Sequence, residues 1–287
     1  MKKIAISFVI LALAIAIFTA GAYATTTPAG KVTISGFAPT IADVMVWNEH
    51  GADANITMET GQTGAVVTAN ATVTDYDGGA DITGASATLY LTGSDSESDN
   101  ANNHTSDSDC VITNGTGDYN KTVTCSFTIG YMAMPGTWTA NITATDGTHS
   151  ASDATANRDV SILLAFDVLD STIEFGDMAP GTNSTDPANV TIQNLGNLVL
   201  GTTYKGDDYT CDVGSIDVNN TRYSANTGNY DSMSSNVLNA TATKDTGFSL
   251  AVSSGTNITD QEFFTILTPS SGAVGACNNT VTIAATA

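Results

Sequence analysis

Apolar and polar residues alternate along much of this chain, which is the pattern of β-strands with one buried and one solvated face. The longest example is residues 65–75, where alanine and valine alternate with threonine and asparagine. Residues 118–129, 137–145 and 188–193 repeat the same period of two. Beyond the first 24 residues no helical period of useful length appears. The pattern therefore predicts an all-β protein.

Further short apolar or alternating runs predict the remaining strands, and turn signals such as Asp77-Gly78 and Pro135-Gly136 separate them. These runs are residues 31–35, 43–47, 85–91, 159–168, 172–175, 198–205, 209–213, 237–243, 247–252, 262–267 and 278–284. Between them, residues 93–109 are expected to form a polar, acidic loop that is long enough to be mobile.

The strands fall into two groups of about seven, which is the number in an immunoglobulin-like sandwich. We predict two tandem antiparallel immunoglobulin-like β-sandwiches, an N-terminal one over residues 25–168, with an extended N-terminal arm, and a C-terminal one over residues 169–287. A single β-helix is the structural alternative. A β-helix needs a regular short repeat, and the sequence has none.

Residues 1–24 have the form of a secretory signal peptide. Lys2 and Lys3 precede a long apolar run, which ends in Ala22-Tyr23-Ala24, so cleavage is expected before Thr25. The alternative is a pilin-type leader that is cut ahead of its apolar run and keeps that run as a helix. No later apolar run is long enough to span a membrane. We therefore expect a secreted or cell-surface protein without a membrane span after cleavage.

The composition narrows the choice of partners. Only 13% of the residues are charged, against roughly 25% in typical soluble proteins, and the formal net charge is −21. A chain with this charge repels nucleic acids and anionic membrane surfaces, so neither is expected as a partner.

The four cysteines of this exported chain predict two disulfides, for which three pairings exist. The proposed division into two sandwiches favours Cys110 with Cys125 and Cys211 with Cys277. The alternative is four buried thiols. A zinc site is disfavoured because the sequence has no Cys-x-x-Cys pair.

N-glycosylation sequons, Asn-X-Ser/Thr, recur throughout the chain. On a strand, the Asn and the Ser or Thr two residues later face the same side, so a sequon places both on the solvated face. We expect this placement for Asn55, Asn70, Asn120, Asn141, Asn189, Asn239 and Asn278. An unglycosylated surface of Thr and Asn is the alternative. N-linked glycans are predicted at Asn55, Asn70, Asn103, Asn114, Asn120, Asn141, Asn183, Asn189, Asn219, Asn239, Asn257 and Asn278.

The residues that commonly carry out catalysis do not form a recognisable set. His104 and His149 are expected to be solvated side chains in polar loops, and no His-x-x-x-His pair suggests zinc. Asp245-Thr246-Gly247 matches the Asp-Thr-Gly of aspartic proteases, but that chemistry needs two such carboxylates and the sequence has one copy. We predict a protein that is not an enzyme and has no cofactor.

Structural calcium is the remaining possibility among cofactors. Asp75, Asp77 and Asp81 surround a glycine turn and partly resemble a calcium loop, although the distal Glu and the flanking helices of an EF-hand are missing. Asp95, Glu97 and Asp99 alternate in the acidic loop. The other interpretation of both sets is that they are solvated turn residues. Bound calcium would stiffen a turn or a joint between subunits.

Two stretches resemble known surface proteins. Residues 189–197, NVTIQNLGN, resemble the strand and turn that open immunoglobulin-like domains in archaeal and bacterial surface proteins, and residues 73–82, VTDYDGGADI, resemble a segment of similar modules. Together with the Thr- and Asn-rich composition, the chain is similar to archaeal S-layer and extracellular filament proteins. The resemblance implies a structural role at the cell surface.

These observations lead to one preferred function and two alternatives. We expect a glycosylated subunit of an extracellular filament, a homopolymer in which residues 25–35 of one copy complete a sheet of the next. An S-layer or other cell-surface component is the first alternative. An adhesin or carbohydrate-binding module that uses loops such as residues 93–109 is the second, although the chain has only two Trp to stack on sugars. A secreted hydrolase is the least favoured class.

Overall fold

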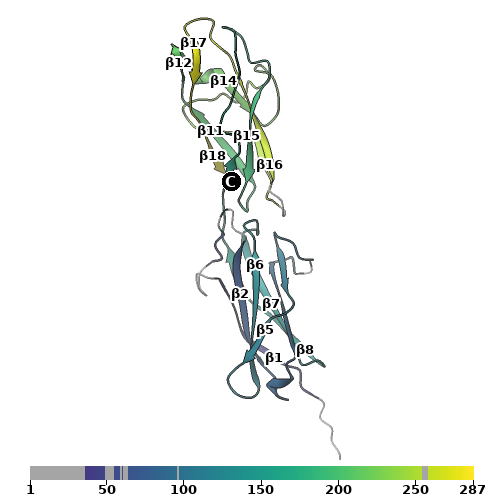
Figure 1. The fold of residues 1–287 in the computed structure, drawn as a ribbon. Helices are drawn as coiled ribbons and strands as arrows, with labels where there is room; N and C mark the ends of the chain where they lie inside the picture. The colour runs from purple at the N-terminus through teal and green to yellow at the C-terminus, as the bar shows by residue number, and fades with distance from the viewer. Residues whose placement is uncertain (1–35, 49–54, 59, 61–63, 96, 254–257) are drawn as a thin grey trace, which may run out of the picture. The chain divides into compact units, whose positions relative to one another are not determined.

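The computed structural model describes residues 36–48, 55–58, 60, 64–95, 97–253 and 258–287 (Figure 1). All the named strands belong to one compact unit, residues 37–287. Its described residues form antiparallel strands and two 3-10 turns and contain no α-helix, which confirms the predicted all-β class. None of the described segments is a helix with the length and apolar character needed to cross a membrane.

The strands are numbered in chain order. They are β1 (Thr40–Asn48), β2 (Ala65–Thr74), β3 (Gly84–Leu91), β4 (His104–Asp107), β5 (Val111–Asn114), β6 (Asn120–Ile129), β7 (Gly136–Thr145), β8 (Ser150–Val160), β9 (Phe166–Val168), β10 (Ala188–Asn194), β11 (Leu200–Gly206), β12 (Tyr209–Val213), β13 (Ser215–Ile216), β14 (Thr221–Ser224), β15 (Thr243–Leu250), β16 (Thr259–Ile266), β17 (Val274–Asn278) and β18 (Val281–Thr286). The 3-10 turns are η1 (Gly79–Asp81) and η2 (Val218–Asn220).

Strands β1 to β8 form a first sandwich of two four-stranded sheets, with the orders β1-β2-β6-β5 and β4-β3-β7-β8. If the strands are lettered in chain order, these orders read A-B-E-D and C′-C-F-G, which is the arrangement of an immunoglobulin-like sandwich. The first sandwich is therefore immunoglobulin-like in strand order as well as in strand number.

The alternation seen in the sequence explains the core of the first sandwich. Along β2, every second residue from Val67 to Val73 is buried and those between are half-buried on the outer face. The inner residues of β6 and β7 meet them from the same and the opposite sheet. Trp138 on β7 is buried at the centre, and its indole Nε1 donates to the carbonyl of Met134 at 2.8 Å.

Strands β9 to β18 form a second sandwich. One sheet has the order β9-β10-β16-β14, which matches β1-β2-β6-β5 of the first sandwich. Facing it are the sheets β15-β11-β18 and β13-β12-β17. Short connections join β11 to β12 and β17 to β18. The antiparallel pairing of β11 with β18 therefore continues as the pairing of β12 with β17. Tyr204, Tyr223 and Phe264 pack together in the core.

The motif NLGN at residues 194–197 is a turn held by two buried amide side chains. Asn194 Nδ2 donates to the carbonyls of Leu198 and Ala251, and Asn197 Nδ2 donates to the carbonyls of Ala133 and Ser161. Gly196 lies between them, and a Cβ at this position would lie 2.3 Å from the carbonyl oxygen of Leu163. The turn therefore needs these residue types.

Several strand predictions are wrong in detail. Residues 172–175 alternate but form no strand, and of residues 237–243 only Val237 makes an isolated bridge before β15 begins at Thr243. Residues 159–168 divide between the end of β8 and β9. No strand was predicted for residues 150–158, which form most of β8, or for the short strands β5, β13, β14 and β17. The predicted strand 31–35 lies outside the described residues, and the boundary at residues 168/169 stays a prediction.

The expected mobile loop at residues 93–109 is also wrong in part. Its second half forms β4, which pairs with β3. This pairing turns the polar run back onto the sheet and gives it internal partners.

Candidate functional site

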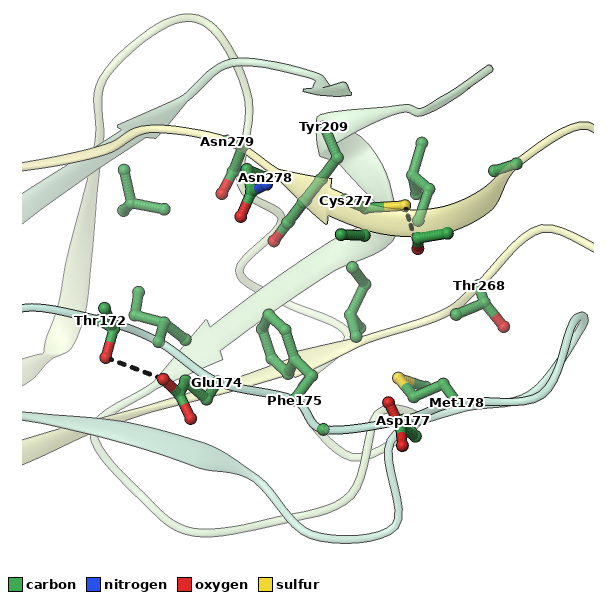
Figure 2. A pocket seen from close by; sticks show the side chains of 18 of the residues that line it. Thr172, Glu174, Phe175, Asp177, Met178, Tyr209, Thr268, Cys277, Asn278 and Asn279 are labelled. Atoms are coloured by element: carbon green, nitrogen blue, oxygen red, sulfur yellow. Dashed lines mark hydrogen bonds between the residues drawn. The ribbon is translucent and has the colours of Figure 1, made fainter. Parts of the chain in front are cut away.

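An apolar groove of about 910 Å³ runs along the second sandwich (Figure 2). Strands β17 and β18 line it. Buried Val190 and Ile266 of the facing sheet also line it, as does buried Tyr209 of β12, which pairs with β17. Tyr209 is fixed by a 3.0 Å hydrogen bond between its hydroxyl and that of Thr221, and its burial raises its pKa. The groove thus lies between the two layers of this sandwich and is lined by residues of both.

The same groove is also lined by residues 171–178, which we call the resident segment. Ile173, Phe175 and Met178 are half-buried and pack against the cores of the second sandwich. The residues between them are exposed. Among the described residues, no main-chain hydrogen bond joins this segment to a strand, and its flanks are held by Leu169 N–H to Thr191 O and Gly181 N–H to Pro269 O. Side chains therefore hold the resident segment in place.

Strand β18 is an open edge of its sheet. It pairs with β11 on one side and, within the described chain, with no strand on the other. Val281, Ile283 and Ala285 pack against the core, whereas Thr282 and Ala284 are exposed. An open edge of this kind presents unpaired N–H and C=O groups that can accept another strand.

Three carboxylates line the groove, those of Asp170, Glu174 and Asp177. Asp170 accepts a hydrogen bond from Thr191 N–H at 2.6 Å, and Glu174 accepts one from the hydroxyl of Thr172 at 3.5 Å (Figure 2). Within the described part of the chain they do not form a group of three whose ligand atoms lie within 4.8 Å of one another.

The predicted calcium residues form a turn in the structure. Asp75 is buried and its Oδ1 accepts from Asp77 N–H at 2.9 Å, while Asp77 accepts from Phe37 N–H. Asp81 follows on η1. In the described chain, the only three-residue group close enough to hold an ion is Asp107 with Cys110 and Cys125, and these two cysteines form a disulfide. Calcium binding at the predicted residues stays a prediction.

The structure pairs Cys110 with Cys125 and Cys211 with Cys277, which is the pairing favoured from the sequence. The first disulfide joins the start of β5 to β6. The second joins β12 to β17, where the two residues are opposite each other in register. Cys277 lines the groove, so this disulfide fixes part of its wall.

The sequon residues differ in how freely their amide nitrogens point to solvent. Asn55 and Asn239 lie outside the named strands, contrary to prediction. Asn257 lies outside the described residues. The Nδ2 atoms of Asn103 and Asn120 donate to Glu97 and to Thr116 O. Six sequon residues lie on strands, with the first three half-buried and the other three exposed: Asn70, Asn120, Asn141, Asn114, Asn189 and Asn278. Asn55, Asn183 and Asn219 are also exposed, and Asn239 is half-buried.

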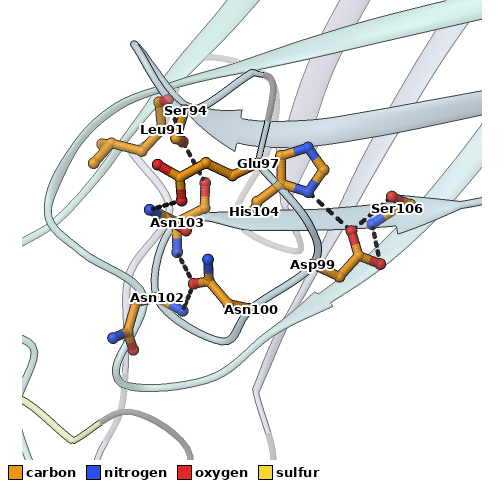
Figure 3. A network of polar contacts seen from close by, with 9 residues as sticks. All are labelled: Leu91, Ser94, Glu97, Asp99, Asn100, Asn102, Asn103, His104 and Ser106. Atoms are coloured by element: carbon orange, nitrogen blue, oxygen red, sulfur yellow. Dashed lines mark hydrogen bonds and ion pairs between the residues drawn. The ribbon is translucent and has the colours of Figure 1, made fainter.

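Residues 94–106 form a polar network (Figure 3). His104 is only 4% exposed, so the expectation of a solvated side chain is wrong. Its Nδ1 lies 2.8 Å from Asp99 Oδ1, and the hydroxyl of Ser106 donates to the same oxygen. The hydrogen bond from Ser106 contributes most, and together with that to His104 it holds the pKa of Asp99 below its ordinary value. His104 is inward because β4 pairs with β3, where its ring stacks on Tyr90.

Two carboxylic acids that sequence reasoning did not bring together lie in the core of the second sandwich. Glu262 on β16 is fully buried, and Asp245 on β15 is buried beside it. Burial first, and then the neighbouring carboxyl of Asp245, raise the pKa of Glu262 to about 9. Burial also raises the pKa of nearby Tyr204. Neither carboxyl lines the groove, so the pair is placed to affect stability rather than a substrate.

The groove itself was missed in the sequence analysis. The available signal was the alternation at residues 172–175, which was interpreted as a strand. Whether such a run pairs depends on how its neighbours are placed, and the sequence does not show this.

Comparisons with known proteins do not assign this chain to a family. No protein-family model matches it. No curated protein matches it. A solved structure of the CsuC–CsuE chaperone–tip adhesion subunit pre-assembly complex from archaic chaperone-usher Csu pili of Acinetobacter baumannii is similar over 81% of this chain and 96% of that chain, with 9% identity and a TM-score of 0.35.

The C-terminal domain of the Streptococcus pyogenes antigen I/II-family protein AspA is similar over 88% of this chain and 96% of that one, with 11% identity and a TM-score of 0.25. A structure described as BspA_C_WT covers 84% of this chain at 12% identity, with a TM-score of 0.22. These scores are too low to bear on function.

Proposed function

We propose that this protein is an exported, glycosylated structural subunit of an extracellular filament, in which copies are joined by donor-strand exchange. The observation that carries the proposal is the open edge of β18 beside an apolar groove. A strand added to such an edge gains main-chain hydrogen bonds and places its alternate side chains in the groove. Because donor and acceptor are different surfaces of one chain, the contact is head-to-tail and can propagate from copy to copy into an open filament.

The two disulfides support export, because such bonds persist in oxidising compartments. The secretory-type leader and the sequons point to the same compartment. The proposed role needs neither a catalytic group nor a cofactor. The N-terminal arm, residues 25–35, is the proposed donor because it contains the alternation of Val32 and Ile34.

Negative-stain electron microscopy of the purified native protein tests this function. We expect filaments, and we expect deletion of residues 25–35 to abolish them while the circular-dichroism spectrum stays that of folded β protein. The matched control replaces residues 25–30 with Gly and Ser and keeps 31–35, and it should still polymerise. Filaments that persist without residues 25–35 would exclude the donor role.

The same images separate the alternatives. Flat two-dimensional arrays would identify an S-layer or a related surface component. Single particles at all concentrations would favour an adhesin or carbohydrate-binding module and would overturn the filament proposal.

A further inference from the structure

Within the described residues, the second sheets of the two sandwiches differ in how their strands are paired. In the first, β7 pairs with β3 on one side and with β8 on the other. In the second, β18 pairs with β11 in the place corresponding to β7, and the described chain supplies no counterpart of β8. The groove lies along this edge, because β17 and β18 line it. Within the described residues, β18 is therefore paired on one side only, next to the groove.

The resident segment lines the groove without pairing with β18 in the described chain. Ile173, Phe175 and Met178 face the cores, and Figure 2 shows Phe175 and Met178 on the stretch that passes β17. Its main chain makes no hydrogen bond to β17 or β18 among the described residues. An incoming strand could supply equivalent apolar side chains and would add main-chain hydrogen bonds to β18 that the resident segment does not make.

Residues 31–37 have the same order of apolar positions as the resident segment. Lys31-Val32-Thr33-Ile34-Ser35-Gly36-Phe37 carries apolar residues at its second, fourth and seventh positions, as does Thr172-Ile173-Glu174-Phe175-Gly176-Asp177-Met178. A glycine separates the second and third apolar residues in both stretches. Gly176, at the fifth position, has a φ of 72°, a backbone conformation that glycine adopts readily, and the glycine of the arm, Gly36, is at the sixth position.

Phe37 supports the match from the structural side. Its side chain is 56% exposed, although it is large and apolar. A single exposed aromatic residue is ordinary. Here, however, it is the third apolar position of the matching pattern, so the described chain presents the end of the donor stretch to solvent.

We infer that the groove beside β17 and β18 accepts residues 31–37 of a second copy of this chain, and that these residues replace the resident segment there. The inference rests on the proposed function and names the acceptor, the donor and the segment displaced. The resident segment covers the apolar groove of a free subunit and is exchanged for the donor on assembly.

A peptide-binding experiment on the full-length protein tests the acceptor. The arm is first disabled by V32D/I34D, and a fluorescent peptide of residues 25–37 is added. We expect saturable binding. A control peptide with Val32 and Ile34 changed to Asp should bind about tenfold weaker or more, because it cannot bury two apolar side chains. Ile283→Asp in the acceptor should weaken binding of the native peptide to a similar degree.

Displacement is tested by weakening the resident segment. Ile173→Ser with Phe175→Ser should tighten peptide binding, whereas Thr172→Ser with Glu174→Ser, at exposed positions of the same segment, should not. If both double variants bind the peptide more tightly than the parent chain, or if neither does, the peptide does not replace the resident segment. If the first pair prevents folding, hydrogen exchange on the arm-disabled chain decides the question. Peptide binding should slow exchange in β18 and speed it in residues 171–178.

Two further results separate this inference from the proposed function. Filaments that depend on the arm, combined with peptide protection at another edge such as β8, would overturn the acceptor assigned here and leave the filament function standing. Absence of both filaments and peptide binding would remove both proposals. When the I34C variant is mixed with the V281C variant, a disulfide should form between one copy of each. A doubly substituted chain that closes only on itself would overturn the second-copy donor.

Discussion

At the scale of single residues, the buried carboxyl of Glu262 makes the stability of the fold depend on pH. The folded chain holds this proton up to its raised pKa of about 9, whereas the unfolded chain releases it near 4.5. Between these values the unfolded state binds fewer protons, so the free energy of unfolding falls as pH rises. We expect Glu262→Gln to remove this contribution, so the wild type should lose melting temperature relative to the variant from about pH 4.5 to about pH 9.

Thermal unfolding across this range measures the effect. Asp186→Asn, which changes an exposed carboxylate, is the control and should follow the wild type. A constant difference in melting temperature between wild type and Glu262→Gln would contradict the assignment.

Asn197 is a second residue whose side chain stabilises the main chain around it. It donates to the carbonyls of Ala133 and Ser161 and accepts from the N–H of Leu163, at distances of 3.0, 2.9 and 2.7 Å. Asn197→Ala leaves these groups without that partner, and we expect a loss of about 2–4 kcal/mol in the free energy of unfolding. Chemical denaturation measures it. The exposed Asn226→Ala should change stability by less than about 0.5 kcal/mol, and equal effects would refute the role of Asn197.

At the scale of elements, the two disulfides constrain loops of different length. Cys110 and Cys125 are 15 residues apart, whereas Cys211 and Cys277 are 66 apart. Because a longer closed loop restricts the unfolded chain more, replacing the first pair by Ser should cost about 3 kcal/mol and the second about 4 kcal/mol. Urea unfolding of the two double variants, compared with the oxidised wild type, gives both values. A larger loss for the first pair would show that strain or packing outweighs loop entropy.

Glycosylation of Asn278 should be incompatible with strand addition. This exposed sequon residue ends β17 and lines the groove, so a glycan there would occupy the path of an incoming strand. We expect glycopeptide mass spectrometry to find Asn278 unmodified in filaments, while Asn189, an exposed sequon residue outside the groove lining, carries a glycan. Thr280→Ala removes the sequon and should leave assembly unchanged. Filaments fully modified at Asn278 would contradict the prediction.

Much of this element-level structure follows from the sequence, and the exceptions share a cause. Strands β2, β6 and β7 were predicted because every second residue is apolar, which depends only on local sequence. The burial of His104 depends on β4 pairing with β3, and the open form of residues 172–175 depends on which strands lie beside them. Glu262 begins the predicted strand 262–267, and nothing in that run indicates that its carboxyl is buried. Such features are decided by tertiary neighbours, which a periodicity does not identify.

At the scale of the whole molecule, the net charge of −21 should oppose assembly. Copies of one strongly acidic chain repel each other, and salt screens this repulsion. The Debye length, beyond which exposed charges are largely screened, falls from about 30 Å at 0.01 M salt to about 10 Å at 0.1 M. We expect the rate of filament growth, followed by light scattering, to rise over this range of NaCl. An uncharged solute at equal osmolality should not raise it. Slower growth in salt would indicate that attraction between opposite charges drives the contact.

The placement of the aromatic residues gives the two sandwiches separate optical signals. Both tryptophans, Trp47 on β1 and Trp138 on β7, belong to the first sandwich, whereas the second is built around the cluster of Tyr204, Tyr223 and Phe264. Tryptophan fluorescence therefore follows the melting of residues 40–160. Each sandwich has four tyrosines, but only the four of the second are buried, so tyrosine circular dichroism in the near ultraviolet is weighted toward residues 166–286. Denaturation curves that coincide would reveal one cooperative unit, and curves that separate would reveal two.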